Sequence, residues 1–95
     1  MRQTMEAETK YKYSEDRILR EVEQYIDSTY SKHYVSKNNT QLFDMFDDPV
    51  EVAGFCRINA SKYIARFGKK AGKNKQDLLK AIHYTILLYH FTEDQ

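Results

Sequence analysis

Apolar residues in the second half of the chain follow the spacing of two helices. Between Pro49 and Phe67 they recur at intervals of three, four and seven residues, as on one face of an α-helix. These positions are 52, 55, 56, 60, 63 and 67. A second helix is expected over residues 75–91, with one side formed by Leu78, Ile82, Thr85, Ile86 and Tyr89. Gly68 and Gly72 lie between the two segments and can adopt the left-handed conformation that ends helices. The pattern therefore predicts helices over residues 49–67 and 75–91, joined by a short loop.

The start of the chain predicts a flexible arm followed by one long helix. Residues 1–13 show no periodicity, and terminal segments of this kind are usually mobile. Ser14 is a good N-cap for a helix over residues 15–30. The apolar face of this helix consists of Ile18, Leu19, Val22, Tyr25, Ile26 and Tyr30.

A short helix is expected between the two halves. Thr40 can cap it over residues 41–46, and Asp47 or Asp48 can cap the long helix that follows. No segment alternates apolar and polar residues as a strand would. We therefore expect an all-α fold, with three main helices and one short helix in a single domain over residues 14–95.

Three polar residues interrupt the apolar face of the 49–67 helix. Asn59, Lys62 and Arg66 stand at positions i, i+3 and i+7, so they share one flank of the helix. Polar groups beside a buried face must be hydrogen-bonded or face a ligand. The following loop adds Lys69, Lys70, Lys73 and Lys75. Residues 57–80 hold eight Lys/Arg and one acidic residue, Asp77, whereas the whole chain has a net charge of +1. Together these residues fit an anion-binding site as well as they fit a solvated turn.

Other chemistries are less well supported. The loop GKKAGKNK resembles a phosphate-binding loop, but Asn74 stands where Walker A sequences have Ser or Thr. His83 and His90 lie seven residues apart without a Cys or acidic partner, so no metal site is expected. The local positive charge also suits nucleic acid, yet the whole chain is nearly neutral and has no known docking motif. Nucleic acid is therefore the less favoured partner.

The sequence has the features of a cytoplasmic protein. Its one cysteine, Cys56, lies on the apolar face, where it is expected to be a small core residue. The first residues are charged and polar, unlike a signal peptide. The longest apolar runs are far too short to span a membrane, so no membrane partner is expected.

The last helix is apolar on nearly all sides. A helix without a polar side lies either in the centre of a core or at an interface. In a three-helix domain one side of this helix would be covered, which would leave Tyr84, Leu87 and Phe91 in water. We therefore expect a homo-oligomer that assembles through this helix.

The order of these residues resembles a small phage-encoded family of unknown function whose members are often labelled nucleotide kinase. That family's pattern is roughly H-Y, an acidic and apolar helix, G-N-x-x-K-Y-x-x-R-x-x-x-K, and D-L-x-K-A-x-x-Y. The matching positions are His33, Tyr34, Asn59, Lys62, Tyr63, Arg66, Lys70, Asp77, Leu78, Lys80, Ala81 and Tyr84. The resemblance covers about residues 32–91, with Ile58 in place of the family's glycine. It implies a phage protein of the host cytoplasm that handles nucleotides, because a characterised relative acts on deoxynucleoside monophosphates.

Residue chemistry and this resemblance lead to the same candidate nucleotide site. The Asn59 amide can read a base or ribose edge. The Arg66 guanidinium can hold a phosphate with two hydrogen bonds, and Lys62 and Lys70 can add positive charge. The loop residue Lys69 belongs to the same set of candidate phosphate ligands.

The remaining candidates in this site are an acid and two aromatic residues. Asp77 could orient Lys62 or Arg66, or accept a hydrogen bond from a ribose hydroxyl. Tyr34 or Tyr63 could stack on a base. No residue can be named as catalytic, and no carboxylate set for the magnesium of ordinary phosphoryl transfer is evident.

Two functions are compatible with these features. The leading hypothesis is a nucleotide-binding protein, in one form a nucleoside monophosphate kinase acting on deoxynucleotides. Its ligand would be ATP or another nucleotide, with no other cofactor evident. The alternative is a non-enzymatic phage effector, which would bind a host protein or sequester a nucleotide without turnover.

Overall fold

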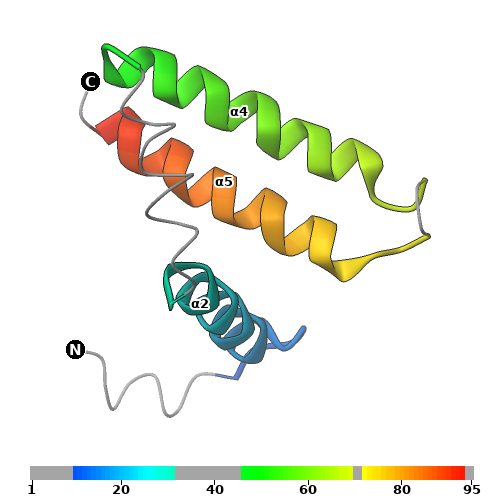
Figure 1. Cartoon of the computed structure of the whole chain (residues 1–95). Coiled ribbons are helices and arrows are strands. Elements are labelled where there is room, and N and C mark those ends of the chain that lie inside the picture. The colour runs from blue at the N-terminus through cyan, green and yellow to red at the C-terminus, as the bar shows by residue number, and fades with distance from the viewer. Residues whose placement is uncertain (1–9, 32–45, 70–71, 94–95) are drawn as a thin grey trace.

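The computed structural model describes residues 10–31, 46–69 and 72–93 of the chain. Within these ranges, helix α2 spans Glu15–Ser31, α4 spans Pro49–Arg66 and α5 spans Lys75–Glu93 (Figure 1). No strand occurs among the described residues, so the predicted all-α fold with three main helices is confirmed. The predicted short helix over residues 41–46 lies outside the described residues, except for Phe46.

The start of α4 has the predicted cap. Asp48 is extended, with φ −149° and ψ 162°, and its carboxylate accepts a hydrogen bond from the N–H of Glu51 at 2.9 Å. The Glu51 carboxylate in turn accepts one from the N–H of Asp47 at 3.2 Å, and Pro49 lies in the first turn. These contacts satisfy backbone donors that a helix leaves unpaired at its N-terminus. Of the two caps considered, Asp48 is therefore the one used.

The other two helices begin differently. Ser14 directly precedes α2 as predicted, but its φ of 64° differs from the extended backbone that is usual for an N-cap. Its carbonyl oxygen accepts a hydrogen bond from the N–H of Ile18 at 2.9 Å. At α5, the side-chain oxygen of Asn74 accepts one from the N–H of Gln76 at 2.8 Å, so this helix starts at the predicted residue.

α4 and α5 form an antiparallel hairpin (Figure 1). The connecting loop reverses the chain at two glycines with positive φ, 86° at Gly68 and 70° at Gly72. The N–H of Gly68 donates a hydrogen bond to the carbonyl oxygen of Gly72 at 2.9 Å, which closes the loop. The predicted left-handed positions are therefore confirmed.

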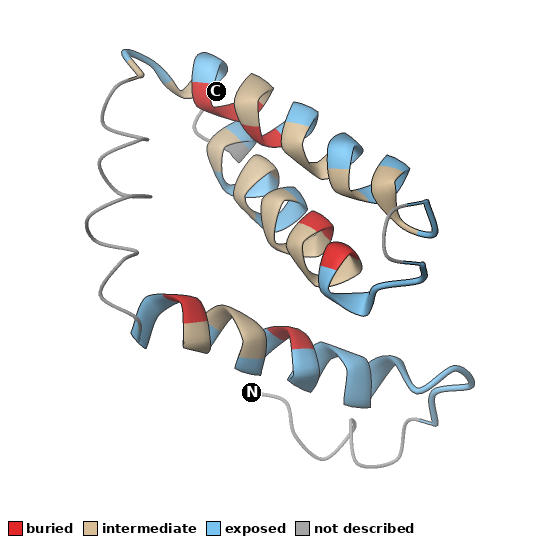
Figure 2. Ribbon diagram, turned by 45° about the vertical axis from the view of Figure 1, so that its right-hand side comes forward, coloured by how far each residue is buried: buried red, intermediate tan, exposed pale blue. Residues whose placement is uncertain are grey.

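The core between the two arms of the hairpin is small. α4 contributes Val52 and Cys56, which the spacing predicts, and also Ala53, which it does not; all three are buried (Figure 2). α5 contributes Ala81 and the acidic Asp77, which is 3% exposed. The fully buried apolar side chains of this contact are small, so the two helices can approach closely here.

The side of α5 that packs against α4 differs from the predicted one. The contact side carries Asp77, Ala81 and Tyr84, whereas Ile86 and Tyr89 on the predicted side are 44% and 70% exposed. Because α5 is apolar on nearly all sides, its spacing does not distinguish the inner side from the outer one.

The residues that we expected at an interface between copies also differ in position from the prediction. The ring of Tyr84 packs against those of Phe55 and Tyr63 inside the hairpin, so Tyr84 does not belong to an outer strip. Leu87 and Phe91 are half-buried.

α2 crosses the hairpin on its α5 side (Figures 1 and 2). It buries Val22 and Thr29, and the ring of Tyr25 meets that of His83 edge-on at a centroid distance of 6.0 Å. Three residues of the predicted buried face are exposed: Ile18, Leu19 and Tyr30. A helix that packs mainly against one neighbour has a narrow contact line, which is why part of its apolar face stays in water.

Candidate functional site

Three cationic side chains surround the ring of Tyr63. Lys62 and Arg66 come from α4, and Lys80 comes from α5. The Nζ of Lys62 lies 4.8 Å from the ring centroid, the Cζ of Arg66 5.0 Å and the Nζ of Lys80 5.4 Å. These distances are typical of cation–π contacts. We call these four residues the Tyr63 cluster.

A row of aromatic rings holds Tyr63 in place. Its ring stacks on that of Tyr84 at a centroid distance of 6.0 Å and an angle of 11°. Tyr84 meets Phe55 edge-on at 6.1 Å, and Phe55 lies 5.5 Å from Phe46. Ring contacts of this kind are directional, so they fix the orientation of Tyr63 and, with it, the arrangement of the cations.

Arg66 is paired with the buried Asp77. Its Nε and Nη2 donate hydrogen bonds to Oδ1 of Asp77 at 3.3 and 3.1 Å. The Asp77 side chain is 5% exposed and that of Arg66 37%. Asp77 also stands in the first turn of α5, where the helix dipole favours a negative charge. The structure thus shows one of the partners predicted for Asp77.

The positive charge of the cluster is not balanced by the described acidic residues. Among the ion pairs that these acidic residues form, the one that includes a residue of the cluster joins Asp77 to Arg66. The three cationic groups lie within about 10 Å of one another, which is close to the Debye length at about 0.1 M salt. Their charges therefore repel, and a bound anion would offset this repulsion.

Asn59 lies on the same side of α4 but is engaged within its own helix. Its side-chain nitrogen donates a hydrogen bond to the carbonyl oxygen of Phe55 at 2.9 Å. This bond gives the side-chain N–H group of the half-buried Asn59 a hydrogen-bond partner, so this group does not need a ligand. The neighbouring Ile58 is 60% exposed.

The structure brings together part of the predicted site. Lys62, Tyr63, Arg66 and Asp77 lie together, whereas Lys69 is exposed in the loop after α4. Lys70 and Tyr34 lie outside the described residues.

Lys80 is the member of the cluster that the site prediction missed. It follows Asp77 by three residues, which places both on one side of α5. This spacing is the signal that could have identified it.

Away from the cluster, burial shifts the pKa of two titratable groups. It raises the pKa of the Cys56 thiol and lowers the pKa of the His83 imidazole. Cys56 is fully buried, which confirms its predicted place in the core.

Two further properties concern the described part of the chain. It contains no group of three or more His, Cys, Asp or Glu side chains arranged to hold a metal ion. None of its helices combines the length and the apolar character needed to cross a lipid bilayer.

Comparison with known proteins identifies the family. Residues 28–85, more than half of the chain, match the model of a family described as proteins of unknown function, DUF3310. This range includes every residue of the Tyr63 cluster and its partner Asp77. No curated protein and no solved structure gives a significant match. The chain therefore belongs to the DUF3310 family of proteins of unknown function.

Proposed function

We propose that the protein binds a nucleotide and holds its phosphates at the Tyr63 cluster. The observation that carries this proposal is the convergence of Lys62, Arg66 and Lys80 on one tyrosine ring, at 4.8–5.4 Å from its centroid. Lysine and arginine side chains are the usual protein ligands of phosphate groups. Phosphate would supply the negative charge that the described surroundings of Lys62 and Lys80 lack.

The packing of Tyr63 supports a role in arranging the cations. Tyr84 stacks on its ring, and three cations approach the same ring. A base that stacked there would have to compete with these neighbours. In our proposal Tyr63 therefore positions the phosphate ligands and does not itself stack on the base.

The resemblance noted in the sequence supports a more specific proposal about the nucleotide and the reaction. Proteins that share the pattern are often labelled nucleotide kinase, which favours a phage protein that acts on deoxynucleoside monophosphates in the host cytoplasm. A kinase reaction would add a second nucleotide, such as ATP, and magnesium. The competing possibility is a phage effector that sequesters a nucleotide, or binds a host protein, without catalysis.

Nucleotide titrations with matched lysine variants test the proposal. Calorimetry with deoxynucleoside mono-, di- and triphosphates should detect binding that Lys62→Ala and Lys80→Ala each weaken by about tenfold or more, because a hydrogen bond to a charged group contributes about 1.5–3 kcal/mol. Lys12→Ala is the matched control. Lys12 also lies over a tyrosine ring, 5.9 Å from the centroid of Tyr13, but outside the cluster.

The results separate the competing functions. Binding followed by phosphate transfer from ATP supports the kinase, whereas binding without product supports sequestration. If no nucleotide binds to the folded protein, both nucleotide proposals are wrong. Binding to DNA or RNA that weakens steeply with salt would instead indicate a nucleic-acid-binding protein.

A further inference from the structure

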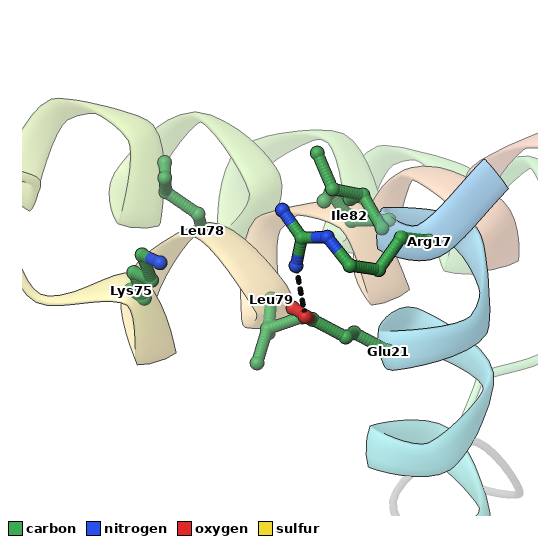
Figure 3. Close-up of a pocket in the computed structure, with 7 residues that line it drawn as sticks. Arg17, Glu21, Lys75, Leu78, Leu79 and Ile82 are labelled. Carbon is green, nitrogen blue, oxygen red and sulfur yellow. Dashed lines mark hydrogen bonds and ion pairs between the residues drawn. The ribbon is translucent and has the colours of Figure 1, made fainter. Parts of the chain in front are cut away.

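A groove separates α2 from the first half of α5. Its volume is about 180 Å³, and the close-up in Figure 3 shows side chains from both helices around it. Its lining residues are Arg17, Ile18, Glu21, Lys75, Leu78, Leu79 and Ile82. The aliphatic members form apolar walls. The ion pair between Arg17 and Glu21 reaches from α2 toward α5, which carries Lys75. An engineered apolar cavity of about 150 Å³ holds benzene, so this groove has room for a large aliphatic side chain.

A different side of α2 carries an apolar ridge. At about 100° per residue, Leu19, Ile26 and Tyr30 point within about 40° of one another. Of the α2 residues that line the groove, Arg17 and Glu21 point about 160° and Ile18 about 100° away from Leu19. Leu19 and Tyr30 are each 65% exposed, although α2 needs apolar contacts to be stable. We call Leu19, Ile26 and Tyr30 the α2 ridge.

Charge is complementary between the ridge and the groove. Glu23 and Asp27 follow the ridge along α2, a helix with five acidic residues and two arginines. Lys75 lines the groove, and Lys73 lies in the loop just before it. An acidic helix that approached this edge would meet positive charge, while its apolar ridge entered the groove.

We propose that a second copy of this chain fills the groove with its α2 ridge, and that Leu19 is the central side chain of the contact. Ridge and groove lie on different sides of the same helix, so no copy fills its own groove. Each copy offers a groove to one neighbour and a ridge to another. Such head-to-tail contacts form closed rings or extended chains. This assembly is independent of nucleotide binding.

Light scattering on matched variants tests this interface. The unmodified protein should have a mass of at least two copies of the 11.3 kDa chain. Leu19→Glu, which changes the ridge, and Leu79→Glu, which changes the groove, should each give the monomer mass. Val50→Glu is the control, because Val50 is 60% exposed on α4, away from both surfaces. Ile18→Glu replaces the groove variant if circular dichroism shows that Leu79→Glu does not fold.

A mixing experiment separates a specific contact from general loss of solubility. The ridge variant keeps an intact groove, and the groove variant keeps an intact ridge. An equal mixture should therefore form pairs with one copy of each variant, although neither associates alone. The proposal is wrong if the unmodified protein is monomeric at tens of micromolar, or if the mixture stays monomeric. It is equally wrong if Ile86→Glu, on the exposed side of α5, dissociates the assembly while Leu19→Glu does not.

Discussion

Arg66 of α4 and Asp77 of α5 connect the two arms of the hairpin through a single carboxylate oxygen. Nε and Nη2 of Arg66 both donate to Oδ1 of Asp77, at 3.3 and 3.1 Å. Asp77 is almost fully buried, whereas about a third of the Arg66 side chain faces solvent. The pair thus joins the two helices on its buried side and keeps a guanidinium beside Tyr63 on its exposed side.

Removing Arg66 should destabilise the fold, because it leaves a buried carboxylate without its cation. For Arg66→Ala we expect a loss of about 1–3 kcal/mol in the free energy of unfolding, measured by urea denaturation. The double variant Arg66→Met/Asp77→Leu should recover most of this loss, since an apolar pair leaves no buried charge. If the double variant is less stable than Arg66→Ala, the ion pair is not the source of the effect.

The same variants separate the structural role of Arg66 from its proposed role in binding. Even if its stability is recovered, the double variant lacks the guanidinium of Arg66. Its nucleotide affinity should therefore stay about ten- to a hundredfold below that of the unmodified protein. Calorimetry on the double variant measures this directly. Normal affinity in a stable double variant would assign Arg66 to the fold alone.

Local signals predicted the helices and their ends well. Asp48 and the left-handed Gly68 and Gly72 act through their own backbone or their nearest neighbours, so a short stretch of sequence specifies them. The apolar face of α4 was predicted in part: Val52 and Cys56 are buried, whereas the buried Ala53 was not among the predicted positions.

Orientation between helices was harder to predict. α5 has apolar residues on nearly all sides, and its sequence could not show that Ala81 and Tyr84 face α4 while Tyr89 faces outward. Lys80 was missed for a related reason. Its place beside Tyr63 depends on how α5 is rotated against α4, which is set by packing between the helices and not by the spacing within one of them.

Replacing a glycine by alanine should lower the stability of the protein at two positions and raise it at the third. Gly68→Ala and Gly72→Ala should each destabilise the protein by about 1–2 kcal/mol, because φ values of 86° and 70° are unfavourable for residues with a Cβ. Gly54 lies inside α4, and a Cβ built there meets no atom within 4 Å. Gly54→Ala should therefore stabilise the helix by about 0.5–1 kcal/mol. Thermal unfolding of the three variants tests the prediction, which would be wrong if all three shifted in the same direction.

The contact between α2 and α5 should weaken in acid. Burial lowers the pKa of His83, whose ring lies edge-on to Tyr25 of α2. Below the ordinary pKa of about 6.5, the unfolded chain therefore binds a proton at this position more readily than the folded chain. The free energy of unfolding should then fall as the pH decreases from about 6.5, and this contribution should level off below the folded-state pKa.

Comparison with a phenylalanine variant isolates the effect of His83 from that of the other titratable groups. His83→Phe keeps an aromatic ring beside Tyr25 but cannot be protonated, so it should lose less stability between about pH 7.5 and about pH 5.5 than the unmodified protein. His90→Phe, which makes the same replacement at an exposed histidine of the same helix, is the matched control. Urea midpoints at the two pH values provide the measurement. Equal acid sensitivity of His83→Phe and the unmodified protein would show that the half-buried imidazole of His83 does not control this contact.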